Sequence, residues 1–450
     1  MSSTFVARLC AQPAILRPLA GIVIVLAGLV GAPASAADSA LTLSEARSLA
    51  VLRSRQLAAQ DLAVLSSREM AVSARQFPDP ILKVGIDNLP VNGSDRFSLT
   101  NDFMTMRRVG VMQEITRSDK LRFRAERYER TAEKSLAEKA VATALIERDT
   151  SIAWLDRYYA EQMVVAVSEQ VVQAGLEVQA AESAYRSGRG SQADVFAARS
   201  VLAALDDRAS ELQQKARNAK TVLTRWVGEA GEAQLAGPPG WDSISLDPAM
   251  LDTELSHHPQ IAVLDRQTEI AQAEARVAQA DKSADWSVEL TYQQRGPTYS
   301  NMVSVGLVIP LQWDQKHRQD RELSAKLAMV EEAKAEREEA LRQQVAETRT
   351  LIDEWKNDRE RVARYERELL PLAGQRTEAL LAAYRGAKAS LADLLAARRV
   401  EIDVRLQSLQ LQADTARLWA QINFLAPLNG LAPISHPISG VDTTTNKELP

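Results

Sequence analysis

The sequence of 450 residues has almost no cysteine, since Cys10 is the only one. Disulfide bonds, thiolate metal sites and a cysteine nucleophile all require thiols in the mature protein. Cys10 lies ahead of an apolar run at residues 19–30 instead of after it, so it is not placed as a lipid-modified cysteine. We expect it to leave with a cleaved leader. The mature chain must then be held together by packing or by oligomerisation.

The leader is predicted from the first 36 residues. Arg8 and Arg17 are followed by the apolar run and by Ala34-Ser35-Ala36, which is the basic, apolar, small-residue order of a secretory signal peptide. We therefore assign residues 1–36 as a signal peptide, with cleavage before Ala37. The mature protein is predicted to be exported.

Aromatic residues and long apolar runs are also scarce. Aromatics make up 5% of the chain and hydrophobic residues 46%, so alanine, leucine and valine supply most of the apolar surface. This composition favours thin helical layers over a thick core. No apolar run after residue 37 approaches the roughly 18–20 residues that cross a bilayer as a helix. An inner-membrane protein with helical spans is therefore excluded.

Basic charge is not in excess. The net charge is −5, and without the two arginines of residues 1–36 the balance is 52 basic against 59 acidic residues. We therefore expect no nucleic acid partner. The sequence contains no phosphate-binding Gly-Lys-Ser/Thr loop, so energy must come from a partner. We predict neither an enzyme nor a bound cofactor.

The chain does contain an internal repeat. Residues 184–199, AYRSGRGSQADVFAAR, return 199 positions later as residues 383–398, AYRGAKASLADLLAAR, with nine of sixteen residues identical. Each copy follows a long helical stretch, precedes a heptad-patterned helix and has a pair of amphipathic strands upstream. The chain is therefore predicted to be a tandem duplication.

Hydrophobic periodicity divides both copies in the same way. The first repeat, residues 37–246, is predicted to contain a helix (43–76), a β-hairpin (81–115), a long helix (118–186), a tip turn (187–190), a helix (191–227) and a connector (228–246). The second, residues 247–425, repeats the order with a helix (247–282), a β-hairpin (285–311), a long helix (314–385), a tip turn (386–389) and a helix (390–425). A polar tail, residues 426–450, follows.

The lengths of the predicted helices indicate how they pack. In each repeat the two shorter helices together match the long one, so two half-length helices stacked end to end can lie along one full-length helix. Residues 191–227 carry one heptad seam of apolar side chains, and residues 390–425 carry two. A helix with two seams has neighbours on both sides, as the wall of a helical cylinder requires.

The predicted strands are apolar on one face and polar on the other, as in the wall of an outer-membrane barrel. Four strands cannot close a barrel, and unpaired edges are costly in hydrocarbon, so the chain needs copies of itself. Two copies would leave a side-chain-filled interior and three an aqueous lumen. We favour the trimer, since a helical cylinder that continues a barrel makes sense as a duct. A soluble sheet capping a coiled coil is the alternative.

The repeat centres on a turn motif, Tyr185-x-x-Gly188-x-x-Ser191-x-x-Asp194 in the first copy and Tyr384-x-x-Ala387-x-x-Ser390-x-x-Asp393 in the second. With the duplication and the hairpin-between-helices order, this motif resembles the TolC family of trimeric outer-membrane efflux ducts over essentially the whole mature length. The resemblance implies that the turns form a periplasmic tip that meets an adaptor protein. The residues it assigns to docking are Tyr185, Gly188, Arg189, Ser191, Tyr384, Gly386, Lys388 and Ser390.

The resemblance also implies that Asp194 and Asp393 line the entrance gate of the duct. Three copies of each would form a carboxylate ring that attracts cations and is held shut by Arg189 or Lys388. The alternative is that Ser191 and Ser390 are ordinary N-caps and both aspartates only stabilise the helix starts, as acidic residues in a first turn commonly do. Ala387 departs from the family glycine, and we expect the neighbouring Gly386 to supply the backbone freedom.

Metal chemistry is weakly indicated. Residues 77–90, FPDPILKVGIDNLP, and the Met104–Arg108 segment resemble the heavy-metal branch of the family more than the drug or protein-secretion branches. His257 and His258 are adjacent and would point roughly 100° apart on a helix, so no metal site is assigned to them. Met104, Met106 and Met112 share one predicted strand face. One hypothesis is that their thioethers bind copper or silver as soft ligands. The alternative is that a wide barrel keeps the thioethers too far apart to bind one ion.

The predicted fold class is mainly α with a small membrane β part. Long coiled-coil helices form an α-barrel, and two β-hairpins per protomer contribute to a trimeric 12-stranded outer-membrane β-barrel. The expected function is a passive outer-membrane duct that conducts substrate, heavy-metal cations first, to the exterior. Its expected partners are two further copies, a periplasmic adaptor, an RND-type inner-membrane pump and outer-membrane lipid. A drug efflux or type I protein secretion duct and a non-membrane periplasmic adaptor or coiled-coil scaffold are the alternatives.

Overall fold

The computed structural model of the protein describes residues 40–426. The predicted signal peptide at residues 1–36 and the polar tail from residue 427 onward lie outside the described residues. The helices and strands in chain order are α1 (Leu43–Arg53), α2 (Arg55–Ala74), β1 (Ile81–Asp87), β2 (Met106–Ile115), α3 (Ser118–Arg186), α4 (Gln192–Val227), η1 (Gly228–Glu232), α5 (Leu251–Ser256), α6 (Pro259–Asp281), β3 (Trp286–Gln294), β4 (Met302–Val308), α7 (Gln319–Arg364), η2 (Tyr365–Leu369), α8 (Leu370–Arg385) and α9 (Leu391–Asn423).

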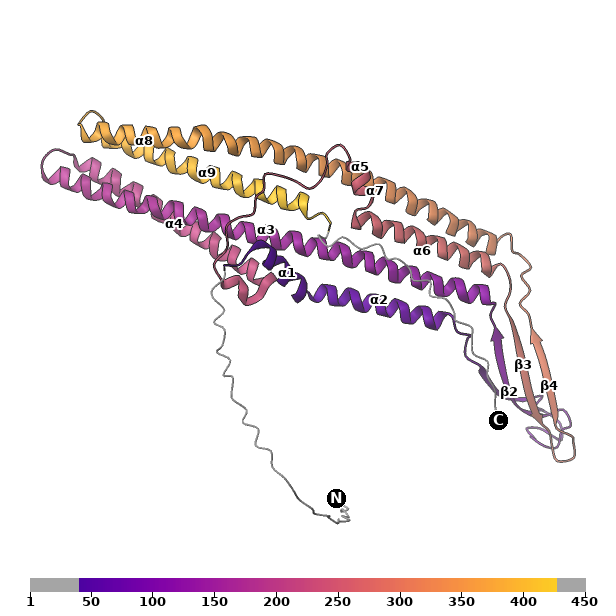
Figure 1. The fold of residues 1–450 in the computed structure, drawn as a ribbon. Coiled ribbons are helices and arrows are strands. Elements are labelled where there is room, and N and C mark those ends of the chain that lie inside the picture. Colours follow the sequence, from indigo (N-terminus) through magenta and orange to yellow (C-terminus); the bar gives the residue numbers. More distant parts are fainter. Residues whose placement is uncertain (1–39, 427–450) are drawn as a thin grey trace, which may run out of the picture. The chain divides into compact units, whose positions relative to one another are not determined.

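The helices of residues 40–426 form a layer in which α3 is central (Figure 1). In the half next to the sheet, α3 packs against α2 on one side and α6 on the other, and in the other half it packs against α4 and α9. Helix α7 packs against α6 and α9, and α8 continues it beside α9. Half-length helices therefore lie end to end on both sides of the 69-residue α3.

Helix α9 has packed neighbours on two sides, as its two seams predict. It contacts α3 on one side and α7 and α8 on the other. Leu394 and Leu395, which belong to different seams, are both buried. The seam of α4 is one-sided and faces α3. The mainly helical class with a small antiparallel sheet is confirmed.

The segment 228–246 crosses the helix layer near the middle of α3. Leu41 pairs with Leu235 in a short parallel bridge beside the buried Trp154. Three indole N–H groups and one guanidinium from the long helices donate to backbone carbonyls that this segment and Leu41 provide. These bonds are Trp154 Nε1 to Leu41 O (3.1 Å), Trp355 Nε1 to Trp241 O (3.2 Å), Trp419 Nε1 to Ser243 O (2.9 Å) and an Arg157 amino group to Gly231 O (2.6 Å).

The helix predicted at residues 43–76 is divided at Ser54. This residue has an extended backbone, with φ −66° and ψ 115°, which a continuous helix cannot contain. Its hydroxyl accepts from the Leu57 N–H at 3.3 Å and so caps α2. The break carries neither proline nor glycine, and the periodicity of the sequence runs across it.

Two further predicted helices differ from the structure. The helix predicted at 247–282 is wrong as one unit, since α5 ends at Ser256 and α6 begins at Pro259. Pro259 lacks an N–H and has the φ of a first helical residue, so a helix starts there. The helix predicted at 314–385 begins at Gln319, because residues 313–318 form turns, and it contains a π-helical segment, Tyr365–Leu369.

The second strand of the first hairpin, predicted from Phe97, begins at Met106. Phe97 has a φ of +59° and donates its N–H to Pro90 O at 2.8 Å, which closes a turn and is incompatible with a strand. Met104 also precedes β2, so its assignment to one strand face with Met106 and Met112 is wrong. The latter two remain on one face.

The four strands form one antiparallel sheet in the order β1-β2-β3-β4. The register aligns Val84, Val109, Tyr292 and Val303 across all four strands. Strands β2 and β3 join the hairpin of the first repeat to that of the second. The sheet adjoins the helix ends that precede or follow its strands, those of α2, α3, α6 and α7 (Figure 1).

Candidate functional site

The sheet carries its apolar side chains on one face. Two adjacent cross-strand rows are apolar in every strand, and each of their side chains is between 47% and 76% exposed. The rows are Val84, Val109, Tyr292 and Val303, and Leu82, Val111, Leu290 and Val305. An uncovered apolar surface of this kind marks a contact with lipid or with another protein.

The opposite face of the sheet is polar and internally paired. Lys83 Nζ on β1 lies 2.6 Å from Glu289 Oε2 on β3. Gly110 lies on β2 between these strands, and a Cβ there would be 2.6 Å from Thr291 Oγ1, so the close approach of β3 requires glycine at this position. This face suits contact with water.

Both edges of the sheet are free in the described chain. Strand β1 pairs only with β2, and β4 pairs only with β3. Each edge strand therefore presents a row of backbone N–H and C=O groups without strand partners. The sheet can be extended on both sides by another chain.

The two tip turns lie together at the far end of the helix layer (Figure 1). Val195 of α4 and Leu391 of α9 belong to one buried cluster, and Tyr384 packs against it. Tyr185 of the other turn is 48% exposed. The structure therefore brings the two predicted docking turns side by side, although their tyrosines have different environments.

Both tip turns end their helices with the same hydrogen bonds. In the first, Gly188 N–H donates to Tyr185 O at 3.0 Å and Arg189 N–H to Ala184 O at 2.9 Å. In the second, the N–H groups of Ala387 and Lys388 donate to Tyr384 O and Ala383 O at 2.9 and 2.8 Å. This is the Schellman termination, whose central residue takes a left-handed backbone.

The expectation that Gly386 supplies the backbone freedom is wrong. Gly386 has a φ of −84°, whereas Ala387 itself has a φ of +55°, close to the +70° of Gly188. The two turns therefore have equivalent geometry. The left-handed position is set by the hydrogen bonds of the helix end, so alanine adopts it at a cost of about 1–2 kcal/mol.

Each turn is followed by a capping box. Ser191 Oγ accepts from the Asp194 N–H at 3.1 Å, and Asp194 Oδ2 accepts from the Ser191 N–H at 2.9 Å. Ser390 and Asp393 make the same pair of bonds, both at 3.2 Å. Each copy of the motif therefore spans the end of one helix and the start of the next.

Hydrogen bonds hold both aspartates in the ionised form. The Ser191 N–H, and after it the Ser191 hydroxyl, lower the pKa of Asp194. The Ser390 hydroxyl, and after it the Ser390 N–H, lower the pKa of Asp393. Within residues 40–426 no ion pair joins either carboxylate to Arg189, whose Nε donates to Ser187 Oγ at 3.2 Å, or to Lys388. The N-caps Ser191 and Ser390, predicted as the alternative to a gate, are therefore confirmed. The bond from each aspartate back to the serine N–H was not predicted, although serine followed three residues later by an acidic residue is its signal.

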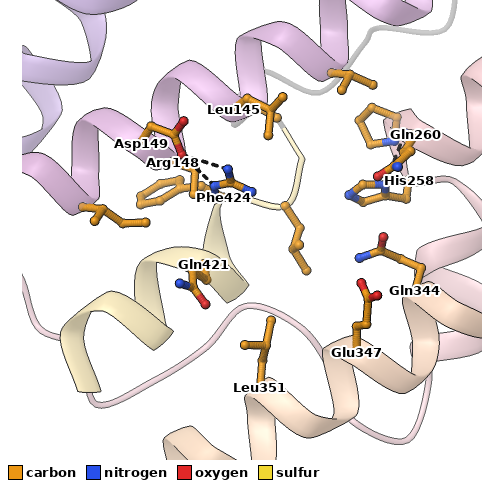
Figure 2. Close-up of a pocket in the computed structure, with 15 residues that line it drawn as sticks. Leu145, Arg148, Asp149, His258, Gln260, Gln344, Glu347, Leu351, Gln421 and Phe424 are labelled. Atoms are coloured by element: carbon orange, nitrogen blue, oxygen red, sulfur yellow. Dashed lines mark hydrogen bonds and ion pairs between the residues drawn. The ribbon is translucent and has the colours of Figure 1, made fainter. Parts of the chain in front are cut away.

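Figure 2 shows a cavity of about 400 Å³ where α3, α6, α7 and the C-terminal end of α9 meet. His258 points into it from the start of α6, opposite Arg148 and Asp149, which pair with each other at 2.8 Å. His258 Nδ1 accepts from the Gln260 N–H at 3.2 Å, so the ring is a helix cap. Burial lowers the pKa of His258, and the Leu425 backbone acts in the opposite direction.

Metal ligands do not converge in residues 40–426. No group of three or more histidine, cysteine, aspartate or glutamate side chains there could hold a metal ion. His257 follows α5, and His258 caps α6. None of the helices in this part of the chain combines the length and the apolar character needed to cross a bilayer.

Comparison of the sequence with protein-family models and with curated proteins gave no match. Solved structures are similar to this chain along most of its length. The outer-membrane channel OprN matches with 17% identity and a TM-score of 0.70, over 86% of this chain and 89% of that chain.

Two other solved structures are similar to the same extent. The outer membrane protein VceC from Vibrio cholerae matches with 18% identity and a TM-score of 0.69, over 85% of this chain and 95% of that one. CusC, described in relation to transmembrane channel formation, matches with 14% identity and a TM-score of 0.71, over 85% and 92%. At these identities the likeness establishes a common fold.

Proposed function

We propose that this chain, which has the fold of the TolC family of outer-membrane channels, is the outer-membrane duct of a tripartite efflux system. The observation that carries the proposal is the sheet with an uncovered apolar face and two free edges. This sheet continues into a helix layer that includes the 69-residue α3, roughly 100 Å long at 1.5 Å per residue. The arrangement suits a membrane pore with a long periplasmic extension.

Closure of the pore requires further copies of the chain. Strand edges without partners cost several kcal/mol per backbone group in hydrocarbon, so β1 of one copy pairs with β4 of the next. Three copies give 12 strands around an aqueous lumen lined by the polar face, with the apolar face toward lipid. The helix layers of the three copies join in the same way at α2 and α4 on one edge and α7 and α8 on the other.

The tips serve as the docking site for a periplasmic adaptor, and Asp194 and Asp393 line the entrance. Both carboxylates are ionised at neutral pH, since the ordinary aspartate pKa lies well below neutrality and the serine partners lower it further. In a trimer they form a negatively charged ring that favours cations. Neither Arg189, whose Nε donates to Ser187 Oγ, nor Lys388 makes an ion pair within the described chain, so both can contact the aspartates of a neighbouring copy.

The cargo we propose is heavy-metal cations, expelled with an RND-type inner-membrane pump. The support is the likeness of residues 77–90 and of the Met104–Arg108 segment to the heavy-metal branch, together with the cation-favouring entrance. Deletion of the gene should lower tolerance to copper, silver or zinc salts. If it lowers tolerance to organic drugs alone, the duct serves drugs and the metal proposal fails.

The channel proposal is tested by reconstituting the purified mature protein in planar bilayers. We expect a detergent-soluble trimer that opens cation-preferring pores. Asp393→Asn keeps an acceptor for the Ser390 cap but removes the charge, so it should reduce the cation preference, whereas Asp403→Ala, an exposed acid farther along α9, should not. Current and selectivity unchanged in Asp393→Asn would remove this aspartate from the gate. A stable monomer that needs no detergent would refute the duct itself.

A further inference from the structure

The segment 309–318, which joins β4 to α7, exposes a large aromatic side chain. Trp313 is 88% exposed, more than any other large hydrophobic residue between positions 40 and 426. The segment lies where the sheet meets the helices. Two other exposed aromatic residues occur at the same end, since Trp286 begins β3 and Phe77 precedes β1.

Hydrogen bonds hold this segment against the C-terminal end of α6. The side-chain amide of Gln312 donates to Asp281 O at 3.1 Å, and that of Gln315 donates to Lys282 O at 3.0 Å. The same Gln315 nitrogen also donates to Gln312 Oε1 at 2.8 Å. The glutamine side chains therefore face α6, and the Trp313 side chain faces outward. Because the segment is already ordered, little conformational entropy is lost when a partner binds to it.

Charge next to the tryptophan indicates the kind of partner. Lys316 and Arg318 are exposed and make no ion pair with the residues that the structure describes. The His317 side chain is paired with that of Asp314, with Nδ1 and Oδ1 2.7 Å apart. An indole ring prefers the boundary between hydrocarbon and water, and cationic side chains at that level contact lipid phosphates.

We propose that residues 309–318 bind the headgroup layer of the periplasm-facing leaflet, with Trp313 as the anchor and Lys316 and Arg318 at the phosphates. The inference rests on the proposed function, which places the sheet in the outer membrane. The segment then fixes the depth at which the sheet sits, because it is the point where the apolar face ends and the helices begin. Trp286 and Phe77 extend the same belt around the barrel.

The test uses single nitroxide labels in a Cys10→Ser background, since Cys10 is the only native cysteine of the chain. Trp313→Cys is compared with Val305→Cys, on the apolar face of β4, and with Leu52→Cys, an 82% exposed apolar position on α1. The labelled full-length proteins are reconstituted in vesicles of phosphatidylethanolamine and phosphatidylglycerol. Collision with oxygen, which concentrates in lipid, and with a water-soluble nickel chelate reports the depth of each label.

We expect the label at 305 to collide mainly with oxygen, the label at 52 with the chelate, and the label at 313 with both. If 305 lies in lipid while 313 behaves like 52, the anchor is refuted and the duct proposal stands. A label at 313 that neither reagent reaches means that a neighbouring copy covers it, which also refutes the anchor. If 305 itself is aqueous, the proposed function fails together with the anchor.

The basic residues are tested separately. In the Trp313→Cys background, Lys316→Gln with Arg318→Gln should move the label toward water in vesicles that contain phosphatidylglycerol. Arg321→Gln, an exposed cation on α7 beyond the segment, is the control and should leave the depth unchanged. Equal depth in the double variant and its parent would refute the phosphate contacts.

Discussion

The left-handed residue of the second tip turn allows a sharp test of the structure. Ala387 has a φ of +55° and Gly386 a φ of −84°, so the glycine stands one position before the place where it would relieve strain. The equivalent residue of the first turn, Gly188, has a φ of +70°. Substitutions at these three positions are therefore expected to change the stability of the turns in different directions.

Ala387→Gly should stabilise its turn. It removes a backbone strain of about 1–2 kcal/mol from the closed turn. Glycine also has more conformational freedom in the open turn, which offsets roughly 0.5–1 kcal/mol of that effect, so the turn is stabilised by about 0.5–1 kcal/mol. Gly188→Ala should cost about the same, because nothing lies within 4 Å of the added Cβ and only the backbone term remains. Gly386→Ala should stabilise slightly, since its φ is ordinary and its Cβ would be 3.5 Å from Ala382 O.

Hydrogen–deuterium exchange of the full-length protein measures these effects where they occur. The Lys388 N–H, bonded to Ala383 O at 2.8 Å, reports the second turn, and the Arg189 N–H reports the first. Exchange through local opening should slow about twofold to fivefold at Lys388 in Ala387→Gly and accelerate by a similar factor at Arg189 in Gly188→Ala. If Gly386→Ala accelerates exchange while Ala387→Gly has no effect, the left-handed position belongs to Gly386 and the reasoning fails.

Three further predictions concern other parts of the chain. Ser390→Ala should destabilise the first turn of α9 by about 1 kcal/mol, which is measured as faster amide exchange there but not in α4. The Ser390 hydroxyl and N–H lower the pKa of Asp393, so the cap contributes its stability at neutral pH and loses it as pH falls through the lowered pKa. An equal effect of the mutation on exchange at pH 7 and pH 2 would contradict the assignment. His258→Asn keeps a helix-capping side chain that does not titrate. Burial lowers the pKa of His258, so the wild-type cap is stable above the usual histidine range and weakens as pH falls through the lowered pKa. The amides of α6 should therefore exchange more slowly in the variant than in the wild type only at low pH. Gly110→Ala brings a Cβ to 2.6 Å from Thr291 Oγ1 and should reduce the yield of heat-modifiable trimer on gels, whereas Gly306→Ala, whose Cβ would be 3.7 Å from Glu289 Cβ, should not.

Patterns that repeat within a few residues were sufficient to predict much of this protein. The 69-residue α3 and the seams of α4 and α9 follow from helical periodicity, and the two faces of the sheet follow from alternation along each strand. The tip motif follows from the duplication, and its serine N-caps follow from the spacing of Ser191 and Asp194, whereas the Schellman end at Gly188 was not predicted. These features are local because each depends on the geometry of one helix or strand.

Only the tertiary structure decided the features that depend on distant partners. The break at Ser54 interrupts no hydrophobic pattern, and the left-handed backbone of Ala387 is imposed by hydrogen bonds against its own preference. The pairing of β2 with β3 joins segments about 180 residues apart, which alternation alone cannot select. The outward position of Trp313 depends on contacts between residues 312–315 and the end of α6, because a side chain is exposed or buried according to what its neighbours cover.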